Sequence, residues 1–143
     1  MRTIKFRGKR IDNGEWVYGY FVGITDNVAI IIPFEKVNYD VGYIGESECC
    51  YCFPETIGQF TGLYDKNGKE IYEGDIIASE GYSQARHYVR YLEDEAMFIA
   101  MIIGSPLQEW CMVRQSWIDK FGKRIIGNIH DNPELLKGGN YEL

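Results

Sequence analysis

The sequence predicts a mainly β protein with little helix: an N-terminal β meander, then a small SH3-like β-barrel and a short C-terminal helical turn. Apolar and polar residues alternate with period two over several short runs, as in half-buried strands. Clusters of Gly, Asn and Asp separate these runs and are typical of turns. The 16 glycines and 11 tyrosines favour the same fold.

The domain organisation is predicted from length and from one change in composition. The chain has 143 residues, enough for one domain or two small ones. The pattern changes near Phe53-Pro54. We therefore expect an N-terminal β subdomain over residues 1–56 and a barrel subdomain over residues 57–143, with one compact domain as the alternative.

Three strands are predicted in the first subdomain. Ile4 and Phe6 alternate with polar residues, so residues 1–10 contain a strand. An aromatic strand over residues 15–22 and a β-branched strand over residues 28–32 follow, separated by short turns. Between residues 33 and 56 we expect an irregular connection with one or two short strands.

Two chain reversals lie close together in the next stretch, between a strand over residues 57–64 and a strand that starts at 76. Asn67 and Gly68 tolerate the positive φ that the first reversal needs. At the second, Gly74 supplies a permissive backbone and Asp75 can accept hydrogen bonds from nearby amides. These four residues are predicted to be structural turn positions.

The remaining elements are predicted from runs of apolar residues. Strands over residues 88–91 and 97–103 flank an acidic turn, although the second run also fits a buried helix. A strand over 110–113, a helical turn over 116–121 and a strand over 124–129 follow. Asn at an N-cap and Pro at N1 predict a short helix from Asn132-Pro133.

Three segments resemble one known family. Residues 59–77 (QFTGLYDKNGKEIYEGDII), residues 126–136 (IGNIHDNPELL) and the opening IKFRG resemble the YopX family of bacteriophage and prophage proteins. Residues 79–123 and the cluster Cys49-Cys50-Tyr51-Cys52 depart from that pattern. The resemblance implies a mostly β fold, and it implies no activity, catalytic residue or cofactor.

The cysteines and histidines offer two kinds of reactive site. Cys50, Cys52 and Cys111 with His87 or His130 would supply four zinc ligands, but a second Cys-x2–4-Cys pair is missing. Cysteine catalysis needs a neighbouring base, and no motif brings Cys111 to a histidine. We therefore expect free thiols, no metal, no cofactor, no catalytic residue and no enzymatic activity.

The basic N-terminal strand offers a candidate nucleic-acid face. Lys5, Arg7 and Lys9 share one side of the predicted strand and would neutralise phosphates. Aromatic residues between Trp16 and Phe21 would stack on single-stranded bases. Alternatively, the cations only protect a strand edge from pairing. The net charge of −6 disfavours nonspecific nucleic-acid binding.

The leading functional hypothesis is a noncatalytic protein-interaction module, and a nucleic-acid-associated module is the alternative. The expected partner is an unidentified host or phage protein, or a second copy of the chain. No apolar run approaches the ~18 residues of a membrane span, and no signal-peptide pattern is present. We therefore expect a protein of the cytoplasm of a bacterial host.

Overall fold

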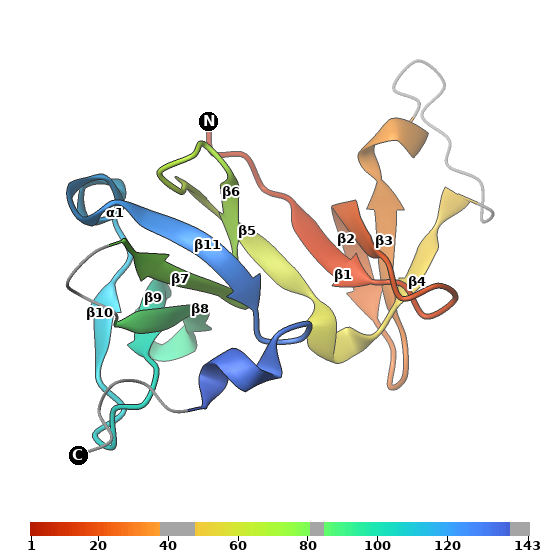
Figure 1. The fold of residues 1–143 in the computed structure, drawn as a ribbon. Coiled ribbons are helices and arrows are strands. Elements are labelled where there is room, and N and C mark those ends of the chain that lie inside the picture. Colours follow the sequence, from red (N-terminus) through yellow and green to blue (C-terminus); the bar gives the residue numbers. More distant parts are fainter. Residues whose placement is uncertain (38–47, 81–84, 138–143) are drawn as a thin grey trace. The chain divides into compact units, whose positions relative to one another are not determined.

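The computed structural model describes residues 1–37, 48–80 and 85–137, and the mainly β fold is confirmed, with two antiparallel sheets and one short helix (Figure 1). The strands are β1 (Phe6–Lys9), β2 (Trp16–Ile24), β3 (Ala29–Pro33), β4 (Cys50–Cys52), β5 (Gly58–Tyr64), β6 (Glu70–Tyr72), β7 (Asp75–Ser79), β8 (Arg86–Leu92), β9 (Met97–Ile102), β10 (Trp110–Met112) and β11 (Lys123–Asn128). Helix α1 spans Gln115–Phe121, and short 3-10 turns lie at Phe34–Lys36, Pro54–Thr56, Glu93–Glu95 and Pro133–Leu136.

The chain forms two compact units, Met1–Phe60 and Thr61–Leu143. Strand β5 runs through the boundary between them, so its first residues pair with β1 and its later residues lie beside β6. The subdomain division expected at residues 56 and 57 stays a prediction.

The first unit contains the predicted β meander. Its strands follow the order β4-β3-β2-β1-β5, and β2 pairs with both β1 and β3. Alternate residues of β2 are buried, as the period-two pattern indicates. One face of the sheet carries a core of buried side chains: Val17, Ala29, Ile31 and Cys52.

Close approach of two strands explains a glycine in the middle of β2. A Cβ atom built on Gly19 would lie 1.9 Å from the carbonyl oxygen of Ile32 on β3. Such contact is impossible for a side chain, so only glycine permits this pairing. A Cβ atom on Gly23, in the same strand, would have no other atom within 4 Å, so space does not restrict that position.

The expected short strand in the connection between the meander and β5 is β4, whereas residues 38–47 of that connection lie outside the described ranges. Strand β4 pairs with β3 on one side. On its other side the Ile11 N–H donates to the Tyr51 carbonyl and the Phe53 N–H donates to the Lys9 carbonyl, both at 2.9 Å. The edge of β4 is thus covered by the residues that follow β1.

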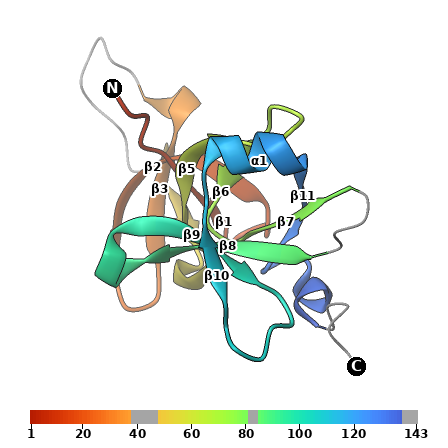
Figure 2. The same cartoon turned by 90° about the vertical axis from the view of Figure 1, so that its left-hand side faces the viewer.

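The second unit contains β6, which lies beside the end of β5, and a five-stranded sheet in the order β10-β9-β8-β7-β11. The ambiguous run at residues 97–103 is strand β9, which pairs with β8 and β10. Figure 2 shows α1 across one end of this sheet. Ile118 of α1 packs with Ile71, Ile77 and Val89 to form the core of the unit.

One side chain of α1 forms hydrogen bonds with the last residue of β5. The Gln115 amide donates to the Tyr64 carbonyl at 2.8 Å and accepts from the Tyr64 N–H at 3.0 Å, so it pairs with β5 as a strand residue would. Gly122 ends the helix with φ 58°, a left-handed conformation that glycine adopts without cost.

The side chain of Asp65 organises the first of the two predicted reversals. Gly68 has φ 80°, as the turn prediction requires. The buried Asp65 carboxylate accepts hydrogen bonds from the N–H groups of Asn67 (2.8 Å) and Lys69 (2.9 Å). Its second oxygen accepts from the N–H of Ile125, on β11, at 3.1 Å. Asp65 therefore fixes both the turn and its place on the sheet.

The second reversal follows the predicted chemistry. Gly74 has φ 88°, and the buried Asp75 carboxylate accepts a hydrogen bond from the Tyr72 N–H at 2.8 Å. Strand β6, which lies between the two turns, is too short to show a period in the sequence.

At the C-terminal end, the predicted helical turn is present as Pro133–Leu136. Asn132 takes the N-cap position, but its side chain does not cap the turn. Instead its Oδ1 accepts from the Asn128 N–H at 3.1 Å. Within the described ranges, no helix has the length and apolar character needed to cross a membrane.

Candidate interaction face

The sheet of the first unit has a second face, opposite the core, that collects aromatic and aliphatic side chains. The pairing registers are Arg7↔Tyr18, Lys9↔Trp16, Tyr20↔Ile32 and Ile30↔Tyr51. Because paired residues point to the same side of a sheet, their side chains share one face. We call it the outer face and define it by Arg7, Lys9, Trp16, Tyr18, Tyr20, Ile30, Ile32 and Tyr51.

Three tyrosines form the exposed part of the outer face. Tyr18, Tyr20 and Tyr51 are 42%, 39% and 54% exposed. Ile30 and Ile32 lie between them on β3 and are half-buried. Tyr20 packs edge to face on Phe34, with ring centroids 4.9 Å apart, which holds one ring in a fixed position.

The three cations predicted as a nucleic-acid face lie against aromatic rings. The Arg7 guanidinium is 4.7 Å from the ring centroid of Trp16, and the Lys9 ammonium is 5.8 Å from it. The Lys5 ammonium lies 4.8 Å from the ring centroid of Phe60. Such contacts stabilise a cation on an aromatic face.

Arg7 is more deeply buried than the two lysines. Arg7 is only 6% exposed, whereas Lys5 and Lys9 are half-buried. A phosphate needs access to the guanidinium, so the exposed charge on this side of the sheet comes from Lys5 and Lys9. The role of these residues in nucleic-acid binding stays a prediction.

The cysteines are all free thiols, and Cys52 lies in the first core. Burial raises the pKa of Cys52 to about 11 and also raises the pKa of Cys50 and Cys111. A raised pKa lowers the thiolate fraction and hence the nucleophilicity at neutral pH. In the part of the chain that the structure describes, no group of three His, Cys, Asp or Glu side chains is placed to hold a metal ion.

A buried cluster in the second unit escaped the sequence analysis. Lys123 and His87 are both buried and both contact Trp117. The Lys123 ammonium lies 4.8 Å from the Trp117 ring centroid, and the His87 ring stands edge-on to it at 5.3 Å. The sequence contained one sign of this burial. Lys123 precedes the apolar Ile125 by two residues, and residues two apart in a strand lie on the same face of the sheet.

Burial determines the charge state of this cluster. It lowers the pKa of His87 to about 4, and the positive charge of Lys123 adds to that effect. Burial also lowers the pKa of Lys123. Among the described residues, the His87 Nδ1 has no hydrogen-bond partner. His87 is therefore neutral at pH 7 and enclosed, which suits a packing role better than proton transfer to a substrate.

The second histidine belongs to a local turn. Asn128 Oδ1 accepts hydrogen bonds from the N–H groups of His130 and Asp131, at 3.0 and 2.9 Å. The Asp131 carboxylate accepts from the Asn128 side-chain amide at 3.1 Å. These bonds agree with a turn-forming role for the His130-Asp131 pair.

Comparisons with known proteins find a family model and similar solved structures. A family model described as YopX protein matches residues 5–137. The crystal structure of protein EF1440 from Enterococcus faecalis is similar, with a TM-score of 0.62 and 26% sequence identity. The similarity covers 96% of this chain and 100% of that chain. Among curated proteins, no sequence matches this chain.

Proposed function

The chain belongs to the YopX family, and from that premise we propose that it is a noncatalytic protein-interaction module encoded by a bacteriophage or prophage. Its partner is a host or phage protein, or a second copy of the chain. The outer face of the first unit is the docking surface.

One observation carries this proposal: Tyr18, Tyr20 and Tyr51 are exposed together on one face of the first unit. Tyrosine is enriched at the energetic centres of protein interfaces, because it buries a large rigid ring and retains a polar tip. The isoleucines between them extend the apolar area, and the neighbouring cations suit a partner segment that carries acidic residues.

The absence of catalysis is supported by the state of the reactive side chains. Burial raises the pKa of three cysteine thiols, which suppresses the thiolate. The neutral His87 side chain is only 5% exposed, so a substrate in solution does not reach it. The four free thiols also support our assignment of the protein to the reducing cytoplasm of a bacterial host.

Capture from lysogenic bacterial cells tests the docking surface. The wild-type chain is compared with the triple variant Tyr18→Ser, Tyr20→Ser and Tyr51→Ser. The control variant is Tyr64→Ser with Tyr91→Ser, because these two tyrosines are similarly exposed in the second unit. We expect one protein to be retained by the wild type and the control, with nuclease and in high salt, and lost by the triple variant.

Self-association is checked in the same set by sedimentation velocity of each purified chain. Loss of a dimer in the triple variant alone assigns the outer face to contacts between copies. Equal retention of every captured protein by the triple variant and the wild type would exclude the outer face as the docking surface.

A nucleic-acid-associated module is the second candidate, favoured by Lys5 and Lys9, which lie against the aromatic rings of Phe60 and Trp16. In that case a labelled single-stranded oligonucleotide binds with a steep salt dependence. Lys5→Glu with Lys9→Glu abolishes the binding, whereas Lys69→Glu with Lys137→Glu in the second unit leaves it intact. Salt-insensitive or absent oligonucleotide binding rejects this candidate.

We also propose that the strands of the second unit are connected as in an SH3-like barrel. Support comes from β11, which returns after a helical segment to pair with β7, the first strand of the meander β7-β8-β9-β10. Small barrels of this kind host unrelated functions, so the strand connectivity alone implies no chemistry.

A further inference from the structure

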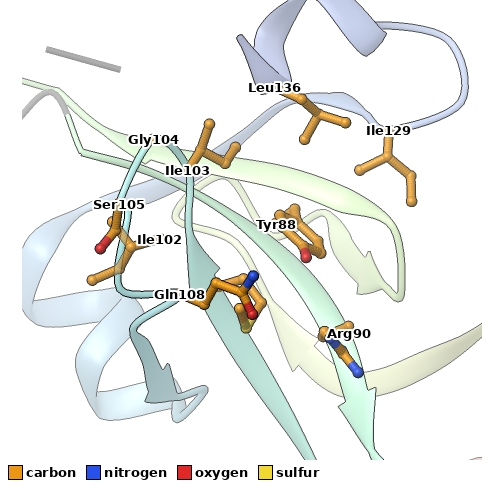
Figure 3. A pocket seen from close by; sticks show the side chains of 10 residues that line it. Tyr88, Arg90, Ile102, Ile103, Gly104, Ser105, Gln108, Ile129 and Leu136 are labelled. Carbon is orange, nitrogen blue, oxygen red and sulfur yellow. The ribbon is translucent and has the colours of Figure 1, made fainter. Parts of the chain in front are cut away.

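The second unit contains a cavity of about 520 Å³, which falls in the size range of small-molecule sites. Strand β8 contributes Tyr88 and Arg90 to it. The end of β9, the loop after it and the C-terminal segment provide the remaining walls (Figure 3). The site is separate from the outer face and independent of the function proposed above.

The walls of the cavity are mostly apolar. They include Met101, Ile103, Ile129 and Leu136, which together form a surface for an aliphatic or aromatic group. Met101 pairs with Tyr88 across β8 and β9, so these two side chains leave the sheet on the same side.

Arg90 supplies the charge of the cavity. Of the described residues that line it, Arg90 alone is charged. Within the described ranges, its guanidinium has no hydrogen-bond or ion-pair partner. The nearby Glu109 carboxylate does not line the cavity, and it accepts the Ser105 hydroxyl at 3.1 Å. The cavity therefore combines one available cation with apolar walls.

Gln108 adds an amide from a strained position. Its φ is 52°, a left-handed conformation that is uncommon for a residue other than glycine. Its N–H donates to the Ser105 carbonyl, and the adjacent Glu109 carbonyl accepts from the Ile102 N–H, which holds the loop. The Gln108 side chain extends from the loop toward the β8 side chains (Figure 3). Strain kept at a cavity wall is a feature of binding sites.

We propose that this cavity binds a small carboxylate with an apolar body. Arg90 pairs with the carboxylate, because guanidinium–carboxylate pairs are strong and directional. The Gln108 amide and the Tyr88 hydroxyl donate the further hydrogen bonds. The apolar body lies against Met101, Ile103, Ile129 and Leu136. The ligand is a free acid or the C-terminal residue of a peptide, which present the same groups.

Amide NMR spectra of the full chain, titrated with hexanoate and with hexanamide, test the proposal. The two probes have the same apolar body and differ in charge. We expect saturable shifts at Tyr88, Ile103 and Ile129 with hexanoate, at roughly millimolar affinity for a ligand of this size, and binding of hexanamide weaker by about tenfold. N-acetyl-leucine, which resembles the C-terminal residue of a peptide, separates the two possible ligands. Tighter binding than hexanoate indicates a peptide C-terminus, and weaker binding indicates a free acid.

Two variants locate the binding. Arg90→Gln should weaken hexanoate binding about tenfold, whereas Arg114→Gln, an exposed arginine of the same unit outside this cavity, should leave it unchanged. Retention of the amide spectrum by both variants shows that they fold. Equal affinity for hexanoate and hexanamide, unchanged binding by Arg90→Gln, shifts confined to other residues, or no saturable binding below about 20 mM would each overturn the proposal.

Discussion

Single buried polar residues fix the positions of the turns. Asp65 is 5% exposed and satisfies three backbone N–H groups, two within its own turn and one on β11. The sequence predicted the turn from Asn67 and Gly68, because turn chemistry is local. It missed the bond to Ile125, which lies 60 residues away and has no local signal.

Asp65→Ala should therefore destabilise the protein. Three backbone N–H groups lose their acceptor and a buried side chain is truncated, so we expect the free energy of unfolding to fall by about 2–4 kcal/mol. Urea denaturation followed by tryptophan fluorescence measures the change. Asp12→Ala is the control, since Asp12 forms an exposed pair with Arg10 and its loss should leave the free energy of unfolding almost unchanged. A loss below about 1 kcal/mol for Asp65→Ala would contradict this role.

His87 should make the stability of the protein sensitive to acid. Its pKa is about 4 in the folded chain and 6.5 as the ordinary value. Between these pH values the unfolded chain binds a proton that the folded chain does not, so stability falls as the pH falls from 6.5 toward 4. The total effect is about 3 kcal/mol.

Thermal unfolding of the wild type and of His87→Gln between pH 4 and 7 measures this dependence. The variant has a lower stability at pH 7 through lost packing, but its pH profile should be flatter over the same window. Because His87 contacts Trp117, tryptophan fluorescence reports on the same site. Parallel profiles for the two chains would show that His87 does not govern acid sensitivity.

At the scale of the elements, the pairing of β2 with β3 requires a residue without a side chain at one position. Gly19 permits the approach of β3 to β2, because a Cβ at this position would overlap the Ile32 carbonyl oxygen at 1.9 Å. Gly23, in the same strand, has open space around it. The two glycines look alike in the sequence but differ in what they allow.

Gly19→Ala should separate β2 from β3 and lower the free energy of unfolding by about 3 kcal/mol or more. Gly23→Ala should change it by less than about 0.5 kcal/mol. Chemical denaturation of both variants gives the comparison, and hydrogen exchange of the β3 amides shows whether the pairing is lost. Similar losses for the two variants would mean that the close contact is not what selects glycine at position 19.

The strands were largely predictable because alternation and turn chemistry act over a few residues. Strand β9 was ambiguous, since a continuous apolar run fits a buried strand or a buried helix, and pairing with β8 and β10 decides the matter. The candidate sites were less predictable. The outer face depends on registers among β1 to β4, and Lys123 depends on packing against Trp117. Neither is encoded in a local pattern.

At the scale of the whole molecule, each unit has a core of its own. The buried residues of the first core come from β2, β3 and β4, and those of the second from β6, β7, β8 and α1. Ile31 and Ile77 are both fully buried, one in each core. Local stability should therefore differ between the two units.

Ile31→Ala and Ile77→Ala test this division as a matched pair, each with an expected loss of about 2–4 kcal/mol. Hydrogen exchange should accelerate in β2 and β3 for the first variant and in β7 and β8 for the second. The amides of the other unit should keep their wild-type protection. Uniform acceleration across both sheets in either variant would show that the two cores unfold as one cooperative body.

Strand β5 is a single uninterrupted strand in which the first residues serve one unit and the last residues serve the other. A cut of the peptide bond after Phe60 would leave each half of the strand with its partner, since Gly58 and Gln59 pair with β1 and the Thr61 hydroxyl donates to the Ile71 carbonyl of β6. The covalent continuity of β5 therefore joins two units that each hold their own strand pairing, and residues 1–60 and 61–143, expressed separately, should each keep the pairing of their half of β5. The Phe60-Thr61 junction is thus a rational position at which to divide the chain into its two units.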